Sequence, residues 1–209
     1  MNERISNLAY TAISAVFHPL IYPTLAAVML FTSDTYFSLF EIKAKLYVIG
    51  LVFVCTYLVP LLSMPLLFAS GAISSVTMDN RRERSLPMLV TGAMFYLAYF
   101  LLKKYEAIVF LNIFILTSCI TVIAALFVTY WWKISLHTIG IGGFLAAVVQ
   151  HGRIYGSDNF GLAALILILA GIIGSARLAA QAHSPNQVFA GFFSGFLLMF
   201  GVLQIFFLL

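Results

Sequence analysis

Residues 107–131 decide the fold, and they read AIVFLNIFILTSCITVIAALFVTYW. This run contains no charged side chain and exceeds the roughly 20 helical residues that cross a hydrocarbon core of about 30 Å. The run is also continuous, whereas strands of a membrane β-barrel alternate lipid-facing and lumen-facing residues in segments of about ten. The stretch therefore predicts a transmembrane helix.

Similar runs recur on both sides of this stretch. The hydropathy pattern predicts seven spans, at about residues 12–32, 43–69, 87–102, 107–131, 134–151, 160–177 and 187–209. Only 9% of the 209 residues are charged and 63% are hydrophobic, against about 25% charged in soluble domains. We therefore expect an all-α, polytopic transmembrane helical bundle of six to seven spans, forming a single membrane-embedded domain over residues 1–209.

The charge pattern limits the kinds of partner. Eleven basic residues give a net charge of +4, but they are scattered between hydrophobic runs and form no continuous basic face. We therefore expect membrane lipids, and no nucleic acid, as partners; the oligomeric state stays open. Cys55 and Cys119 lie inside apolar runs without metal-site spacing, so we interpret them as small buried hydrophobic residues.

Three polar clusters interrupt the apolar chain, and the span count places all three on one side of the membrane. The first covers residues 79–87 and contains Arg81, Arg82 and Arg84 just before Pro87. Guanidinium groups suit phosphate oxygens because they present fork-shaped donors. A juxtamembrane contact with anionic lipids is the structural alternative.

The second cluster opens the fifth predicted span. Lys133, Ser135 and His137 place an ammonium, a hydroxyl and an imidazole within five residues. These groups could bind a phosphoryl group and protonate a leaving oxygen. An interfacial histidine with ordinary hydrogen bonds is the alternative.

The third cluster, residues 174–191, is the most informative. Arg177 lies near the end of one span, His183 follows six residues later, and Gln187 lies four residues beyond it. Ionisable residues are costly at membrane depth, so this pattern favours function over packing. His18, near the start of the first span, could line a substrate entrance or simply cap a helix before Pro19.

At this point the chain resembles the type 2 phosphatidic acid phosphatases. Their third motif reads S-R, five residues, H, three residues, D, often as H-x-P-x-D-V-x-A-G. Their middle motif is P-S-G-H, similar to residues 134–137. Their first is K-x6-R-P, often with a further arginine three residues before the proline, and it is matched only by Arg84 and Pro87. The residues in register with the third motif are Arg177, His183, Pro185, Val188, Ala190 and Gly191.

The resemblance implies a membrane-embedded phosphatase without cofactor or metal. His183 would attack phosphorus to form a phosphohistidine, His137 would protonate the leaving oxygen, and Gln187 would orient His183. A metal-free transfer needs several donors around the phosphoryl oxygens. Those expected here are Arg177, Arg84, Arg82, Arg81, Ser135 and Lys133. The substrate would be a lipid phosphate or diphosphate.

Departures from the family motifs keep a second hypothesis open. Leu86, Ala176 and Gln187 stand where the family has Arg, Ser and Asp. The chain could therefore be a phosphatase-like protein that has lost turnover and binds or moves phospholipid head groups. A small transporter would show inverted repeats, and none is visible in the sequence.

The orientation follows from the basic residues on the other predicted side. By the positive-inside rule, that side is expected to be cytoplasmic. We therefore expect a bacterial inner-membrane protein with its site facing the periplasm or the exterior. The residues that mark the cytoplasmic side are Lys43, Lys45, Lys103, Lys104 and Arg153.

Overall fold

The computed structural model describes residues 10, 12–74 and 81–208. In this part of the chain all regular structure is helical, which confirms the predicted all-α bundle. Within these described residues, six helices are long and apolar enough to cross a membrane, so the chain is an integral membrane protein. Their ranges are Ala12–Thr32, Ile42–Ala69, Ser85–Leu102, Glu106–Trp131, Phe160–Ala179 and Pro185–Phe207.

The fifth predicted span, residues 134–151, is a helix of a different kind. Helix α7 (Leu136–Tyr155) has 20 residues, which at 1.5 Å each is about 30 Å. It is less apolar than the other six because it contains His137, Gln150, His151 and Arg153. Most of its residues are buried within the protein, so this helix does not need a lipid-facing surface.

The chain divides into two compact units. Unit 1 combines residues up to Tyr22 with Ile134–Leu209, and unit 2 is the intervening segment Pro23–Lys133.

Unit 2 contains most of α2 (Tyr22–Thr32), then α3 (Ile42–Phe53), α4 (Val59–Ala69), α5 (Ser85–Leu102) and α6 (Val109–Trp131), with short 3-10 turns at Tyr36–Leu39, Arg81–Arg84 and Glu106–Ile108. A π-helical turn, Val54–Leu58, joins α3 to α4 just before Pro60. Since proline has no N–H to donate, such a local widening lets one helix continue through it.

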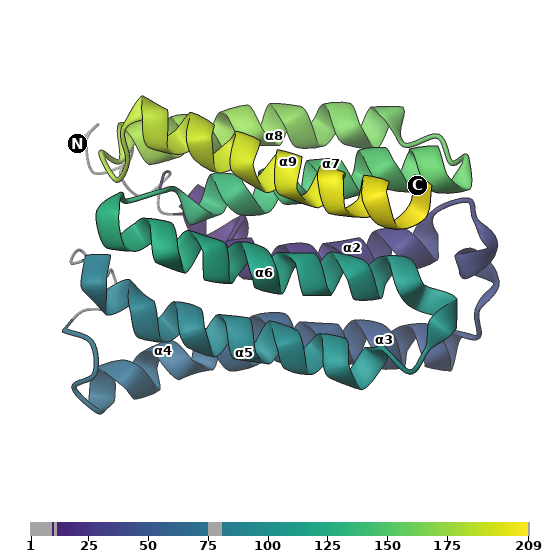
Figure 1. Cartoon of the computed structure of the whole chain (residues 1–209), viewed down its shortest axis with the longest axis horizontal. Coiled ribbons are helices and arrows are strands. Elements are labelled where there is room, and N and C mark those ends of the chain that lie inside the picture. The colour runs from purple at the N-terminus through teal and green to yellow at the C-terminus, as the bar shows by residue number, and fades with distance from the viewer. Residues whose placement is uncertain (1–9, 11, 75–80, 209) are drawn as a thin grey trace. The chain divides into compact units, whose positions relative to one another are not determined.

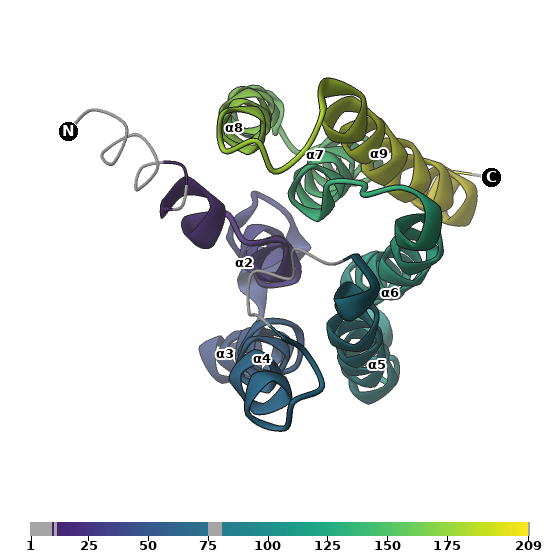
Figure 2. The same ribbon diagram turned by 90° about the vertical axis from the view of Figure 1, so that its left-hand side faces the viewer.

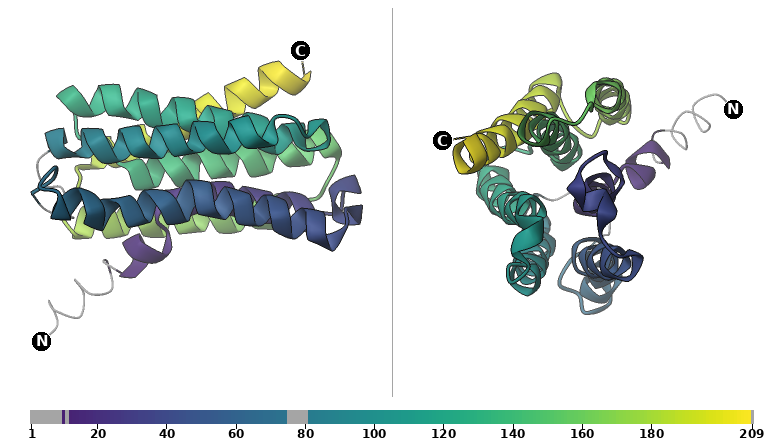
Figure 3. Two further views of the ribbon diagram at one scale, coloured as in Figure 1. Left: turned by 90° about the horizontal axis from the view of Figure 1, so that it is seen from below. Right: turned by 90° about the vertical axis from the view of Figure 1, so that its right-hand side faces the viewer.

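Helices α5 and α6 of unit 2 lie side by side (Figure 3). Gly92 allows this approach, because a Cβ there would lie 2.9 Å from Cδ1 of Ile123. The Cys119 thiol donates a hydrogen bond to the Gly92 carbonyl at 3.2 Å. Both Cys55 and Cys119 are buried, as expected.

Unit 1 contains the short turn η1 (Pro19–Ile21), α7, α8 (Phe160–Ala179) and α9 (Pro185–Leu208), which lie alongside one another in Figure 1. Seen end on, α7 lies between α8 and α9 (Figure 2). Glycines bring α7 and α9 together: a Cβ on Gly142 would clash with the Phe192 carbonyl oxygen, and a Cβ on Gly195 with that of Ile139.

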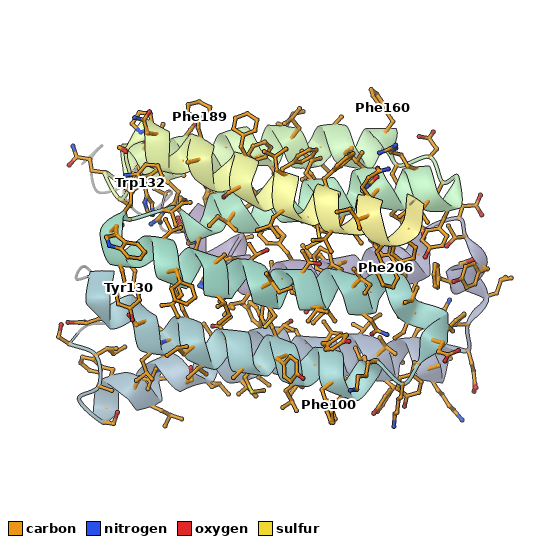
Figure 4. The ribbon with its side chains drawn as sticks, in the orientation of Figure 1. Phe100, Tyr130, Trp132, Phe160, Phe189 and Phe206 are labelled. Atoms are coloured by element: carbon orange, nitrogen blue, oxygen red, sulfur yellow. The ribbon has the colours of Figure 1, made fainter. Side chains whose placement is uncertain are left out.

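The outer faces of α8 and α9 carry large apolar side chains. Phe160 and Phe189 are 83% and 60% exposed and project outward (Figure 4). A hydrocarbon environment suits these faces, which agrees with the two helices being membrane spans.

Three predicted boundaries were wrong by a few residues. Helix α7 continues through the expected loop start at Gly152 and ends at Tyr155, where Gly156 follows in a left-handed conformation with φ of 67°. Helix α5 begins at Ser85, before Pro87, because proline is tolerated in a first turn. Helix α9 begins at Pro185, so Gln187 is helical.

Candidate functional site

The second and third polar clusters meet at one end of unit 1. The start of α7 and the start of α9 touch there: the Ser135 N–H donates to the Gln187 carbonyl at 3.4 Å. A Cβ on Gly191 would lie only 2.7 Å from the Ser135 carbonyl oxygen. The structure thus brings together residues that are about 50 positions apart in the sequence, as the motif pattern predicts.

The connection between α8 and α9 is held in a defined turn. The Ala182 N–H donates to the Arg177 carbonyl and the Gln181 N–H to the Leu178 carbonyl, the two bonds of a Schellman motif. Gln181 takes the left-handed position, with φ of 52°, where glycine is usual. This turn fixes the spacing between Arg177 and His183.

His183 is buried, with 8% of its surface exposed. Its Nδ1 lies 3.3 Å from Oε1 of Gln187, the contact that the sequence predicts. An amide oxygen can only accept, so in the neutral imidazole this contact favours the tautomer with the proton on Nδ1 and the lone pair on Nε2.

Gln187 also has a structural role that the sequence reading missed. Its Oε1 accepts from the Ser184 N–H at 3.1 Å. Ser184 precedes α9, and Ser-x-x-Gln is the capping-box pattern, with Pro185 at the favoured first helical position. One amide oxygen therefore caps the helix and orients the imidazole.

His137 has neighbours on several sides. Its Nε2 lies 3.1 Å from the carbonyl oxygen of Ser14, in the N-terminal helical residues 12–16. The His18 ring packs edge-on against it, with centroids 5.6 Å apart. Arg177 and His183 are also electrostatic neighbours of His137. The two predicted catalytic imidazoles and the predicted phosphate-binding Arg177 therefore share one site.

His18 caps η1, because its Nδ1 accepts from the Leu20 N–H at 3.4 Å. The structural alternative for this residue is thus confirmed. Its contact with His137 also places it at the site, whereas its role as a substrate entrance stays a prediction.

Two donors in the site are buried without a hydrogen-bond partner among the described residues. They are the Ser135 hydroxyl, whose residue is fully buried, and the Nε–H of Arg177. The Nη1 of Arg177 donates to the Ser14 hydroxyl at 3.1 Å, a contact that no motif predicted. A buried unmatched donor costs about 1–3 kcal/mol, so a bound anion would stabilise this arrangement.

The remaining predicted phosphate-binding residues belong to unit 2. Arg81, Arg82 and Arg84 form a 3-10 turn directly before α5, and Lys133 ends the unit. Glu83, within that turn, accepts hydrogen bonds from the Ser74 N–H and hydroxyl at 2.8–3.0 Å. Asp79 and Asn80, which begin this cluster, lie outside the described residues.

Chemically, the site in unit 1 offers imidazole, guanidinium, hydroxyl and amide groups. Within the part of the chain that the structure describes, no group of three or more His, Cys, Asp or Glu side chains could hold a metal ion. No protein-family model, curated protein or solved structure matches this chain. The function is therefore inferred from these residues alone.

Proposed function

We propose that this protein is a membrane-embedded, metal-independent phosphatase that removes phosphate from a lipid phosphate or diphosphate. The observation that carries the proposal is that Arg177, whose Nε–H is buried without a partner among the described residues, lies with His183 among the neighbours of His137. The Ser135 hydroxyl, two residues before His137, is likewise buried and unmatched. An oxyanion is the ligand whose charge and acceptor lone pairs fit such a set. The resemblance to the type 2 phosphatidic acid phosphatases supports the same conclusion.

The proposed reaction has two steps. In the first, Nε2 of His183 attacks phosphorus, a P–N bond forms, and the P–O bond to the lipid breaks while His137 gives its proton to the leaving oxygen. In the second, water loses a proton to His137, attacks phosphorus and releases phosphate. His183 is then regenerated, with Gln187 accepting from its Nδ1–H throughout.

The charge of the transferred group must be neutralised during both steps. Arg177 and Ser135 would donate to the phosphoryl oxygens, which is the main catalytic demand of such a transfer. Arg84, with Arg81, Arg82 or Lys133, is proposed to supply further positive charge.

The proposed substrate has an anionic head and a hydrocarbon tail that stays in the lipid. Phosphatidate, phosphatidylglycerol phosphate, a polyprenyl diphosphate and a lipid A phosphate all meet this description. We further propose a bacterial inner membrane with the site on the periplasmic or exterior side, from the basic residues at the opposite helix ends.

The test is phosphate release by the detergent-purified protein from a panel of lipid phosphates, with EDTA present. The proposal expects release that persists in EDTA and disappears in His183→Ala. Acid-labile, base-stable labelling of His183 by a radioactive phosphate group would identify the intermediate. Release that continues in His183→Ala would overturn the mechanism.

A second candidate is a protein that binds phospholipid head groups without turnover. The observation that favours it is Gln187, whose neutral amide stands where an aspartate would stabilise the imidazolium and also serves as a helix cap. Gln187→Asp and Gln187→Glu separate the candidates, and glutamate keeps the reach of the capping box. Faster release in either variant would identify the amide as a brake; head-group binding without release in all forms would favour the binder.

A further inference from the structure

A groove of about 470 Å³ opens on one side of unit 1, between the N-terminal residues and α8. Small-molecule sites have volumes of about 300–1,000 Å³, so the groove is large enough for a ligand. Tyr10 and Ile13 form one wall. The α8 wall consists of residues one turn apart, namely Ile168, Gly171, Ile172, Ser175, Ala176 and Ala179.

The α8 wall suits a hydrocarbon chain. Ile168 and Ile172 are 62% and 43% exposed, and no atom lies within 4 Å of where a Cβ on Gly171 would be. Because α8 is a membrane span, its exposed flank faces lipid and not water. An open, mainly apolar groove in such a flank is filled by hydrocarbon.

The same two segments that wall the groove also carry a polar pair next to its lining residues in the sequence. Ser14 directly follows Ile13, and Arg177 directly follows Ala176. Arg177 Nη1 donates to the Ser14 hydroxyl at 3.1 Å, and the Ser14 carbonyl oxygen lies 3.1 Å from His137 Nε2. At Ile13 and Ala176, the two walls of the groove therefore lie one residue along the chain from this polar pair.

We infer that this groove holds one hydrocarbon chain of the substrate. The substrate reaches the site sideways from the bilayer, and its head group displaces Ser14 from Arg177 and His137. This inference rests on the proposed function for the nature of the head group. The hydrocarbon chain moves from the bilayer into a groove of similar polarity, so this transfer adds little binding affinity. The groove therefore acts mainly by positioning the phosphate at the site.

Gly171→Leu tests the groove directly, because Gly171 lines it and a Cβ there would meet no atom within 4 Å, so the new side chain can extend into the groove. Gly161→Leu is the matched control on the same helix: its Cβ also meets nothing within 4 Å, and Gly161 does not line the groove. We expect Gly171→Leu to lower kcat/KM for a long-chain alkyl phosphate by about tenfold or more, and to leave a short-chain, water-soluble alkyl phosphate nearly unchanged. Gly161→Leu should affect neither.

A second measurement does not depend on turnover. A long-chain alkyl phosphate with a diazirine at the chain end should label residues 168–179 on ultraviolet illumination, and Gly171→Leu should reduce this labelling. The corresponding alkyl alcohol, which lacks the anionic head, should label the lipid-facing helices without preference.

The outcomes distinguish the two proposals. Groove labelling in a protein that releases no phosphate would sustain the groove and overturn the phosphatase. Normal phosphate release with equal kinetics in Gly171→Leu and Gly161→Leu would sustain the phosphatase and overturn the groove. Phosphate-probe labelling spread evenly over the lipid-facing helices would likewise overturn the groove.

Discussion

The two ends of α7 each carry a histidine, and their surroundings differ. His151, at one end, is fully buried; its Nδ1 lies 3.0 Å from both the Ser157 hydroxyl and the Asn159 amide nitrogen. His137, at the other end, lies beside Ser135 and Arg177, which bury donors without partners. Both histidines are polar groups in a mostly apolar helix, yet among the described residues only the His137 end has buried donors without hydrogen-bond partners.

The His151 end continues into a matched network with α9. Gln150 donates to the Phe200 carbonyl at 3.1 Å, and Arg153 donates to Gln204 at 2.8 Å while its guanidinium lies over the Phe200 ring. The difference teaches that a buried ionisable residue is a weak sign of function by itself. Unmatched donors around it are the stronger sign, because folding alone does not favour them.

The largest expected effect is the loss of phosphate release in His137→Ala, because His137 and not His151 is proposed to act as the general acid. His137→Ala should lower release from a lipid phosphate by about 10³-fold, because the leaving alkoxide then lacks a general acid. An aryl phosphate with an acidic leaving group should lose far less, since its leaving oxygen needs no proton. Steady-state kinetics with both substrates measures this ratio, and an equal loss on both would remove His137 from the acid role.

His151→Ala is the matched control for that experiment. Its kcat should stay within a few-fold of the wild type on both substrates. A loss as large as that of His137→Ala would erase the distinction between the two ends.

The next effect concerns the close contact between α7 and α9, which positions both ends of α7. Gly195→Ala should lower the free energy of unfolding by about 3 kcal/mol, since its methyl group would clash with the Ile139 carbonyl, and backbone yields less than a side chain. Gly201→Ala, on the same helix with nothing within 4 Å of its Cβ, should be neutral or stabilising. Unfolding midpoints in a denaturing detergent titration would compare them.

A smaller effect is expected for stability at the matched end. His151→Ala should lower the free energy of unfolding by about 2 kcal/mol, because the groups that meet it lose a buried partner. His151→Gln, which can still accept a hydrogen bond, should recover part of the loss. Thermal denaturation in detergent measures both variants, and unchanged stability in His151→Ala would contradict a structural role.

The smallest effect concerns the turn between Arg177 and His183. Gln181→Gly should raise the free energy of unfolding by up to about 1 kcal/mol, because glycine adopts a φ of 52° without strain. Gln181→Val should lower it, as a β-branched residue resists this conformation. Reduced turnover in the more stable Gln181→Gly would show that the strain of the turn serves the site.

Much of the fold could be predicted because a helix that crosses a bilayer needs a continuous apolar run, which is visible in the sequence itself. The six apolar helices lie within about three residues of their predicted positions. The position of α7 between α8 and α9 could not be predicted, because the stability of a helix enclosed by protein depends on its packing and hydrogen-bond partners and not on its hydropathy. Gln150 and Arg153 are acceptable there only because α9 supplies Gln204 and the Phe200 carbonyl.

Within the site, the proximity of His137, Arg177 and His183 followed from motif order and sidedness. The contact between Ser14 and Arg177 could not be predicted, since a serine in an apolar run gives no indication of a partner 163 residues away. The capping box at Ser184 and Gln187 was readable from Ser-x-x-Gln alone and was overlooked because the same residues fitted a catalytic motif.

Unit 1 is made of two segments that are far apart in the sequence, and this has a consequence for biosynthesis. Ser14 emerges from the ribosome early, whereas Arg177 and His183 follow only after the whole of Pro23–Lys133 has been made. At about 5–20 residues per second, the N-terminal segment waits on the order of ten seconds or longer for its partners. Unit 2 can thus pack in the membrane while the chain still lacks the cluster of Ser14, Arg177 and His183, and a nascent chain that stalls before α8 cannot form the proposed site.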